Sequence, residues 1–236
     1  MVMTARELAD LMPNATYLES DEPEMESSLH YAQLALLVAC LEWLWRDRNN
    51  FFIGANLTVY FSRQQLRTRD FRGPDFFVVK DTERRDRRSW VTWEEGGKYP
   101  DIIIELLSDS TARVDRNLKK DLYQDRFRTP EYFWLSPETM EFQGYRLVNQ
   151  RYEPIAPNDA GQRYSQVLGL FLGIHEGQLR YFLENGDLVP TLPEATAAAI
   201  AQAQAANDQA QAANTQTEAA NAQAQGTCLA SEYGYQ

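Results

Sequence analysis

The sequence predicts an α/β domain with mixed strands and helices, followed by an Ala/Gln/Asn-rich helical tail. A β-branched run at residues 102–104 leads directly into an acid and then into a stretch with helical spacing, which is the strand-to-helix order of an α/β fold. The composition changes at Pro193, since residues 195–225 consist almost wholly of Ala, Gln, Asn and Thr. A chain of 236 residues with 44% apolar content can bury a substantial core before that point. We therefore expect an acidic leader, one folded domain and a tail, at residues 1–25, 26–190 and 191–236.

The first segments predict an irregular leader with a short helix near residues 5–11, and then a core helix at residues 27–49. The core helix is indicated by apolar residues that recur every three or four positions, namely Tyr31, Leu34, Leu37, Leu41 and Leu44. His30 opens this helix four residues after Glu26, so the two side chains can share one face. They are candidate accessory residues for metal binding or proton transfer. A histidine at a helix start also commonly serves only to hydrogen-bond the local structure.

Apolar runs bounded by turn residues predict strands through the rest of the domain. Besides the run at 102–104, we expect strands at residues 51–61, 76–79, 131–135, 140–149, 152–155, 167–174 and 179–182. Asp75 stands at the beginning of the second of these and therefore beside the core. An aspartate after Pro74 can also be a simple turn cap.

The strand at residues 102–106 carries the second candidate acid. Because side chains alternate along a strand, Glu105 shares one face with Ile103 and Leu107. Its place at the carboxyl end of a core strand is where α/β sheets tend to hold ligands. Two acids such as Asp75 and Glu105, entering one sheet without an evident arginine partner, would cost several kcal/mol unless a cation or a shared proton relieves them.

An amphipathic helix is expected from about Ala112 to Phe127, after a turn rich in Ser, Asp and Thr. Val114, Leu118 and Leu122 recur every four residues and form the predicted buried stripe.

The next stripe of this helix holds Lys119 together with Asp115 and Tyr123, about 100° round the axis. Lys119 should therefore flank the core, whereas Lys120 should face water.

The net charge of −11 argues against a generally basic surface, but the charges are unevenly distributed. Residues 63–88 contain nine Lys or Arg against five acids. A second basic set follows Glu105 and comprises Arg113, Arg116, Lys119, Lys120, Arg126 and Arg128. The two regions either guide a phosphate backbone toward the acids or form a solvated surface compensated by neighbouring carboxylates.

The composition argues against several other classes of protein. Cys40 lies in an apolar helix and Cys228 in the polar tail, which indicates neither a disulfide framework nor a zinc site and fits a reducing cytoplasm. No segment resembles a signal peptide, and the apolar helix around residues 34–45 is too short to span a bilayer, so no membrane partner is expected. The sequence contains no phosphate-binding glycine loop, so no nucleotide cofactor is expected.

The tail contains a seven-residue repeat. Asn207, Asn214 and Asn221 match, and Gln and Ala columns repeat in the same phase. A heptad predicts a helix that can pair as a weak coiled coil, in a homodimer, although alanine makes a thin seam.

Four segments carry a resemblance to a known family: GPDFFVV, PDIIIELLSDST, DRNLKKDLY and TPEYFWLSPET. In their order and spacing the chain resembles the bacterial restriction-endonuclease-like family within the PD-(D/E)XK nuclease superfamily, over roughly residues 20–190. The resemblance implies a restriction-endonuclease-like central mixed sheet flanked by helices. It also implies a metal-dependent endonuclease that hydrolyses DNA phosphodiester bonds.

Carried over to this sequence, the resemblance assigns the first acid to Asp75 and the second to Glu105, both as ligands of Mg²⁺ or Mn²⁺. The superfamily pattern expects a lysine two residues after the glutamate, where this chain has Leu107. The resemblance implies that Lys119 takes over that role.

Several polar residues near these acids are candidate DNA contacts. The helix is preceded by Ser108, Ser110 and Thr111, which either hold a phosphate or only cap the helix N-terminus. On the helix itself, Arg116 and Lys120 can contact the DNA backbone. The departure at Leu107 keeps a second interpretation open, in which the chain is a catalytically weak nucleic-acid-binding or interaction module that retains the nuclease fold.

Overall fold

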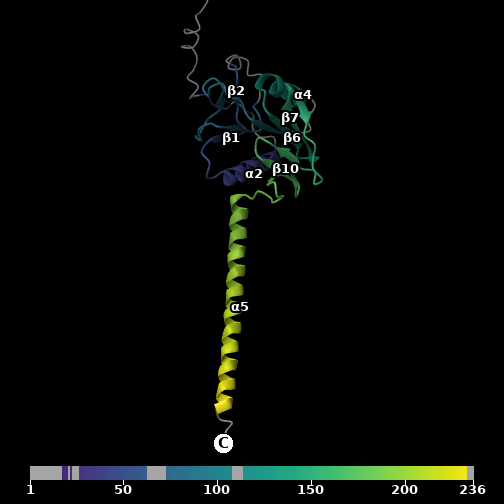
Figure 1. The fold of residues 1–236 in the computed structure, drawn as a ribbon. Helices are drawn as coiled ribbons and strands as arrows, with labels where there is room; N and C mark the ends of the chain where they lie inside the picture. The colour runs from purple at the N-terminus through teal and green to yellow at the C-terminus, as the bar shows by residue number, and fades with distance from the viewer. Residues whose placement is uncertain (1–17, 21, 23–26, 63–72, 108–113, 233–236) are drawn as a thin grey trace, which may run out of the picture. The chain divides into compact units, whose positions relative to one another are not determined.

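The computed structural model describes residues 18–20, 22, 27–62, 73–107 and 114–232, with the backbone alone at 114–117 and 222–232 (Figure 1). The chain divides into two compact units, residues 1–189 and 190–236. The first unit contains a central sheet, two smaller sheets and the helices that cover them. The second contains the helix α5, Leu192–Glu232, which runs for 41 residues.

The central sheet has six strands in the order β1-β3-β5-β6-β7-β8. Its β5 and β6 are parallel and its other neighbours are antiparallel, so the sheet is mixed. The strands are β1 (Phe51–Ala55), β3 (Phe76–Lys80), β5 (Ile102–Leu106), β6 (Glu131–Ser136), β7 (Glu141–Val148) and β8 (Arg151–Pro154). All residues of β5 and β6 are buried, as expected for strands covered on both faces.

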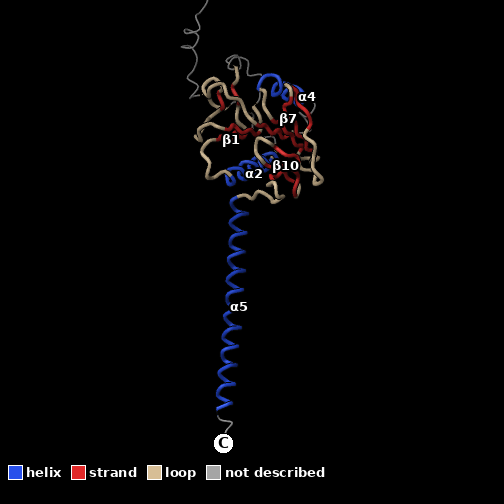
Figure 2. The backbone as a smooth tube through the Cα atoms, viewed as in Figure 1, coloured by secondary structure: helices blue, strands red, loops and turns tan. Residues whose placement is uncertain are grey.

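Helices cover both faces of this sheet, and Figure 2 shows its strands in red between α2 and α4. On one face, α2 (Ser28–Leu44) packs on a cluster that includes Ile102 and Ile104. On the other face, α4 (Val114–Asp121) continues into the π-helical η2 (Leu122–Phe127), whose Tyr123 and Phe127 pack with Ile103. The alternation of side chains in β5 is thus confirmed, and Glu105 lies on the η2 face.

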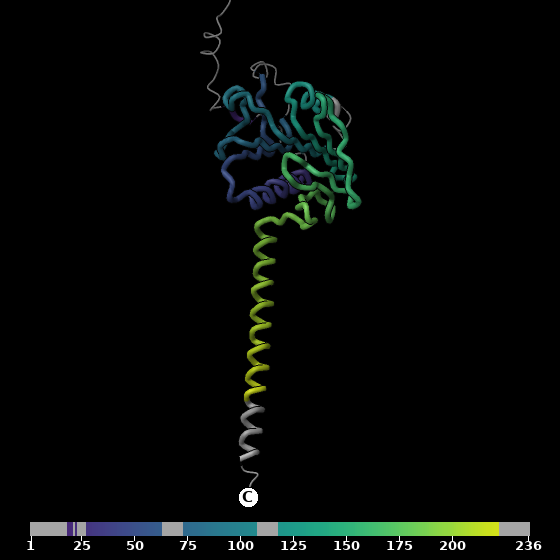
Figure 3. The backbone as a smooth tube through the Cα atoms, viewed as in Figure 1, coloured from purple at the N-terminus to yellow at the C-terminus, as the bar shows by residue number. Residues whose placement is uncertain are grey.

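A three-stranded sheet, in the order β11-β10-β9, supports α2 from a distant part of the sequence. Its strands are β9 (Arg163–Ser165), β10 (Leu170–His175) and β11 (Gln178–Phe182). Gln33 of α2 donates to the Leu179 carbonyl at 3.0 Å and accepts from the Leu179 amide at 2.8 Å. Figure 3 shows α2 and this green segment side by side, and the paired bonds of the amide side chain fix their register.

Two predicted strands differ from the observed ones. The stretch expected as one strand at 51–61 breaks at Asn56, which has φ of +46° and donates its amide to the Asp75 carbonyl. The chain then enters β2 (Val59–Tyr60), which pairs with β4 (Trp90–Val91) in a separate parallel sheet. The strand expected at 167–174 is β10, and β9 was not predicted. The helix expected at residues 5–11 lies outside the described residues.

Candidate active site

Strand register brings Asp75 and Glu105 together. β3 is antiparallel to β5, and Phe76 pairs with Ile104, so the residue before β3 lies next to the residue after Ile104. Asp75 Oδ2 accepts a hydrogen bond of 2.7 Å from the amide of Leu106, the neighbour of Glu105. The two acids therefore meet at the carboxyl end of β5, as predicted from the sequence.

Glu105 is 1% exposed and is held by two side chains from the helix that follows it. Lys119 Nζ donates to Glu105 Oε2 at 2.8 Å, and the Tyr123 hydroxyl donates to Oε1 at 2.6 Å. Lys119 and Tyr123 are four residues apart in sequence and therefore lie on the same face of the helix. The structure thus brings together Asp75, Glu105, Lys119 and Tyr123, four of the residues predicted for the site.

The buried stripe predicted for this helix is wrong at Leu118, which is 66% exposed. The face toward the sheet instead carries Lys119, Tyr123 and Phe127, which also recur every four residues. Two aromatic side chains are larger than the two leucines, and they fill the space above Ile103 in the same cluster. The second half of this face belongs to the π-helical η2, a geometry often found at functional sites.

At position 107, where the superfamily pattern expects a lysine, the structure has a buried leucine in the core cluster with Tyr123. The ammonium group beside Glu105 comes from Lys119 instead. Lys120 does not simply face water, because its Nζ lies 3.6 Å from the centroid of the Tyr145 ring.

His30 contacts the other acid. Its Nε2 lies 3.4 Å from Asp75 Oδ1, and the His30 side chain is only 11% exposed. Ser27 caps α2 by accepting the amide of His30 at 3.2 Å, which fixes the first turn and places the imidazole. His30, predicted as an accessory residue, is therefore in the site, and Glu26 lies outside the described residues.

The two acids have opposite pKa shifts. Burial raises the pKa of Glu105 to about 8, against the opposing charge of Lys119 and with the added repulsion of Asp75. Burial also acts to raise the pKa of Asp75, but the hydrogen bond from His30 and the charge of Lys119 outweigh it and hold the pKa below its ordinary value. Burial acts to lower the pKa of Lys119, and the carboxylates of Glu105 and Asp75 raise it above its ordinary value. Among the described residues, the charge of Lys119 therefore does not offset the burial of Glu105 beside Asp75.

Sequence reasoning missed Glu22, a residue of the predicted acidic leader. Its Oε1 accepts from the Thr58 hydroxyl at 2.8 Å and from the amide of Gly73. Burial raises the pKa of Glu22, the charge of Lys119 lowers it and that of Asp75 raises it, so this third carboxylate lies within the electrostatic reach of the site. A single acid in an acidic, Pro-containing leader has no local signal that distinguishes it from its neighbours.

The remaining predicted contacts are not described by the structure. Ser108, Ser110 and Thr111 lie outside the described residues. Asp115 and Arg116 lie in α4, where only the backbone is described.

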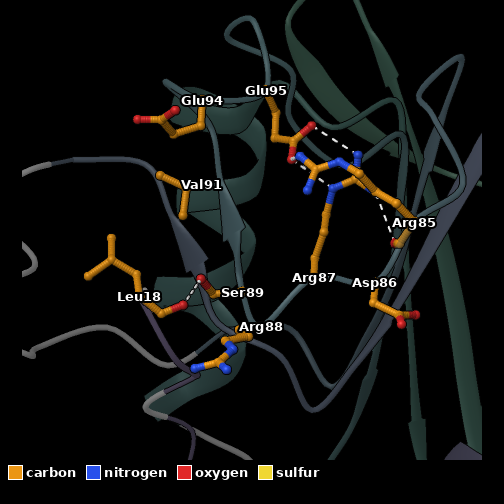
Figure 4. Close-up of a pocket in the computed structure, with 9 residues that line it drawn as sticks. All are labelled: Leu18, Arg85, Asp86, Arg87, Arg88, Ser89, Val91, Glu94 and Glu95. Carbon is orange, nitrogen blue, oxygen red and sulfur yellow. Dashed lines mark hydrogen bonds and ion pairs between the residues drawn. The ribbon is translucent and has the colours of Figure 1, made fainter. Parts of the chain in front are cut away.

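The basic segment before β4 is neutralised by carboxylates of the protein itself. Figure 4 shows Arg85 and Arg87 directed at Glu95, with Nη2 and Nε respectively at 2.8 and 2.7 Å from Oε1, beside a cavity of about 390 Å³. Arg84 pairs with Glu42, and Arg88 Nη1 lies 2.7 Å from Glu19 Oε1. For these four arginines, charge compensation within the protein describes the structure better than a free phosphate-binding surface.

Hard oxygen donors of the kind that bind divalent cations are present at the site. Asp75 and Glu105 supply carboxylates beside the backbone of Leu106, and the charges leave room for a cation. Within the described part of the chain, no three His, Cys, Asp or Glu side chains are grouped so as to hold a metal ion. The two carboxylates are the kind of oxygen donors that fit an ion such as Mg²⁺, which usually takes one or two carboxylates and completes its shell with water and phosphate.

A family model described as "Uma2: Putative restriction endonuclease" matches residues 20–175, well over half of the chain. The chain belongs to the Uma2 family. Its acids, its lysine and its mixed sheet all lie inside the matched segment, and family membership supports a nuclease, an enzyme that hydrolyses phosphodiester bonds. The resemblance seen in the four sequence segments is thereby confirmed.

Comparison with solved structures finds the crystal structure of a putative nuclease belonging to DUF820 from Anabaena variabilis, with 16% sequence identity and a TM-score of 0.45. The match covers 70% of this chain and 90% of that one. No curated protein matches the chain.

Proposed function

We propose that this Uma2-family chain is a metal-dependent endonuclease that cleaves DNA with Mg²⁺ or Mn²⁺ held by Asp75 and Glu105. The observation that carries the proposal is the convergence of three parts of the chain on one buried site. The start of β3 supplies an acid, the end of β5 supplies another, and α4 supplies an ammonium group 2.8 Å from Glu105. Such a set combines cation ligands with a positive charge that can act on a phosphate.

The charge balance supports a cation in this place. Glu105 is buried next to Asp75, and its pKa of about 8 means that it is mostly protonated at neutral pH. A divalent ion would remove this penalty and keep both carboxylates ionised. When bound, it would polarise a phosphodiester oxygen and lower the pKa of a water molecule.

Each side chain of the site then has a separate task. Lys119 keeps its ammonium group charged beside the carboxylates, where it orients the attacking water or stabilises the negative charge that develops on the phosphate. Tyr123 fixes Oε1 of Glu105, and His30 with the Leu106 amide fixes the two oxygens of Asp75. These contacts preorganise the acids, so little reorganisation is needed when substrate binds.

DNA contacts by Ser108, Ser110, Thr111, Arg116 and Lys120 remain part of this proposal, as do accessory roles for Glu26 and Asp115. Ser108, Ser110 and Thr111 closely follow Glu105 in sequence, and Asp115, Arg116 and Lys120 lie on α4 with Lys119. Glu26 precedes His30 by four residues. Since the described arginines before β4 are paired with carboxylates, the helix side of the site is the better candidate for binding phosphates.

The direct test incubates the purified protein with supercoiled plasmid and Mg²⁺ or Mn²⁺, with and without a chelator. We expect nicked and linear products that disappear with the chelator and in the Asp75→Asn variant. If no condition yields products while the protein still retards DNA in a gel, the catalytically weak binding module is the correct interpretation.

We further propose that α5 pairs two copies of the chain in a homodimer, and that the protein works in the cytoplasm. The heptad phase of Asn207, Asn214 and Asn221 falls inside one uninterrupted helix. Cys40 is buried and takes part in no disulfide, which suits a reducing compartment. The described residues include no helix long and apolar enough to span a membrane. A chain that ends at Thr191 should still melt cooperatively and should be a monomer in solution where the full chain is a dimer. If the shortened chain is still a dimer, α5 has no role in pairing.

A further inference from the structure

We propose that Glu22 is a positioning residue of the active site, which holds the backbone of Gly73 and thereby aligns Asp75. The inference deepens the proposed nuclease function, because it adds a residue to the same site. It rests on contacts made by a segment that the sequence presents as a leader.

The segment around Glu22 is anchored to the domain. The Leu18 carbonyl accepts from the Ser89 hydroxyl at 2.7 Å, and the Glu19 carbonyl accepts from the Tyr60 hydroxyl at 3.0 Å. Ser20 Oγ accepts the amide of Thr58 at 3.1 Å. These contacts come from β2, β4 and the residues before them, so the segment lies along the two-stranded sheet.

Glu22 links this anchored segment to Gly73, two residues before Asp75. Its Oε1 accepts both from the Thr58 hydroxyl and from the Gly73 amide. The contact requires glycine, because a Cβ at position 73 would lie 2.7 Å from Glu22 Oε1 and 2.6 Å from the Leu57 carbonyl oxygen. A side chain at position 73 would therefore push the carboxylate away.

The carbonyl group of Gly73 contacts Lys119, the proposed catalytic lysine. Lys119 Nζ lies 3.4 Å from the Gly73 carbonyl oxygen, while it also donates to Glu105. Gly73 is thus fixed at its amide by Glu22 and at its carbonyl by Lys119. Pro74 follows with a restricted φ and transmits this position to Asp75. A displacement of about 1 Å in such a group can cost about 10²-fold in rate.

Two substitutions at position 22 distinguish the effect of the hydrogen bonds of Glu22 from the effect of its charge. Glutamine at position 22 keeps an oxygen that accepts from Gly73 and Thr58 but removes the negative charge. Alanine removes both. Glu19 offers a matched control on the same segment, since its carboxylate pairs with the exposed Arg88 instead of reaching Gly73.

The test measures Mn²⁺-dependent plasmid cleavage and amide hydrogen exchange of residues 73–76 in Glu22→Ala, Glu22→Gln and Glu19→Gln. We expect Glu22→Ala to lower kcat about 10- to 10²-fold with an unchanged KM for DNA, and to speed exchange at Gly73. Glu22→Gln should restore both values to within about threefold of wild type, and Glu19→Gln should match wild type.

Equal loss in the alanine and glutamine variants would show that the charge matters and would overturn the positioning role. Wild-type values in Glu22→Ala would overturn it too. If the wild-type protein cleaves nothing, the proposed function fails and exchange decides the inference. Faster exchange at Gly73 in Glu22→Ala but not in Glu22→Gln then supports the clamp, and unchanged exchange refutes it.

Discussion

Glu105 and Glu131 lie on neighbouring parallel strands, and each is only 1% exposed, yet the protein treats their charges differently. Glu131 accepts from five donors: Arg146 Nε and Nη2, the amides of Gln166 and Val167, and the hydroxyl of Ser165. Among the described residues, the donors to Glu105 are Lys119 and Tyr123, and its pKa is raised to about 8.

The difference is the one expected between a structural carboxylate and the proposed cation ligand Glu105. The donors of Glu131 join the central sheet to the chain that enters β9 and β10, and they distribute the buried charge over many hydrogen bonds. The site of Glu105 places a second acid, Asp75, beside it, and the ammonium group that the described residues supply there is that of Lys119. Perturbed carboxyl groups of this second kind are characteristic of sites that bind a ligand or carry out chemistry.

The largest expected effect tests the functional side of this comparison. Glu105→Gln and Asp75→Asn should each lower Mn²⁺-dependent cleavage by about 10³-fold or more, because each removes a carboxylate that we propose as a cation ligand. Glu105→Gln should melt at or above the wild-type temperature, since it removes a charge that is costly to bury. Mn²⁺ should raise the melting temperature of the wild type but not of either variant. Unfolding of both variants would make these acids structural.

The next effect tests the structural side. Glu131→Gln should destabilise the fold by about 3 kcal/mol, because the Arg146 guanidinium loses its buried anion. Urea unfolding measures this free energy. Cleavage per folded molecule should stay within about threefold of wild type, with the fraction folded taken from circular dichroism. A variant as stable as wild type would remove the distinction between the two glutamates.

Local sequence patterns were enough to predict the surroundings of Glu105. The β-branched run 102–104 predicted the strand, alternation placed Glu105 on one face with Ile103, and helix geometry placed Lys119 beside the core. The pairing of Asp75 with Glu105 depended on strand register, and the resemblance to a nuclease family supplied it before the structure did.

The surroundings of Glu131 and Glu22 depend on contacts between residues far apart in sequence. Glu131 reads as one more strand residue, since its donors Arg146 and Ser165 lie on later strands. Glu22 reaches Gly73 across 51 positions of sequence, which no periodicity records. The error at Leu118 has a local cause. The helix has two sets of apolar residues spaced four apart, and the set with Tyr123 and Phe127 packs on the sheet while Leu118 is exposed.

A smaller effect distinguishes the two adjacent lysines of α4. Lys119→Ala should lower turnover at saturating DNA by about 10²-fold, the scale for loss of a positioned charge. Lys120→Ala is the matched control: its ammonium group packs on Tyr145, so turnover should change by less than about threefold, with a weaker salt dependence of DNA binding. Single-turnover assays at several salt concentrations measure both quantities. Equal turnover in the two variants would reject Lys119 as the replacement for the lysine missing at position 107.

The last prediction uses the raised pKa of Glu105. Its folded value of about 8 lies above the ordinary 4.5, so the folded protein retains a proton that the unfolded chain has lost between these two pH values. The stability of the wild type should therefore fall as pH rises through this window, by at most about 1.4 kcal/mol per pH unit from this group. Asp75 has the opposite shift, and its contribution is lost only below about pH 4, outside the window.

Urea unfolding from pH 5 to pH 8 measures the slope, and Glu105→Gln should be flatter than wild type because it cannot titrate. Saturating Mn²⁺ should flatten the wild-type slope as well, since the ion takes the place of the proton and keeps Glu105 ionised. Parallel slopes in the wild type and Glu105→Gln would mean that Lys119 and Tyr123 already satisfy this carboxylate, as five donors satisfy Glu131. The contrast between the two buried glutamates would then be one of geometry without a difference in charge.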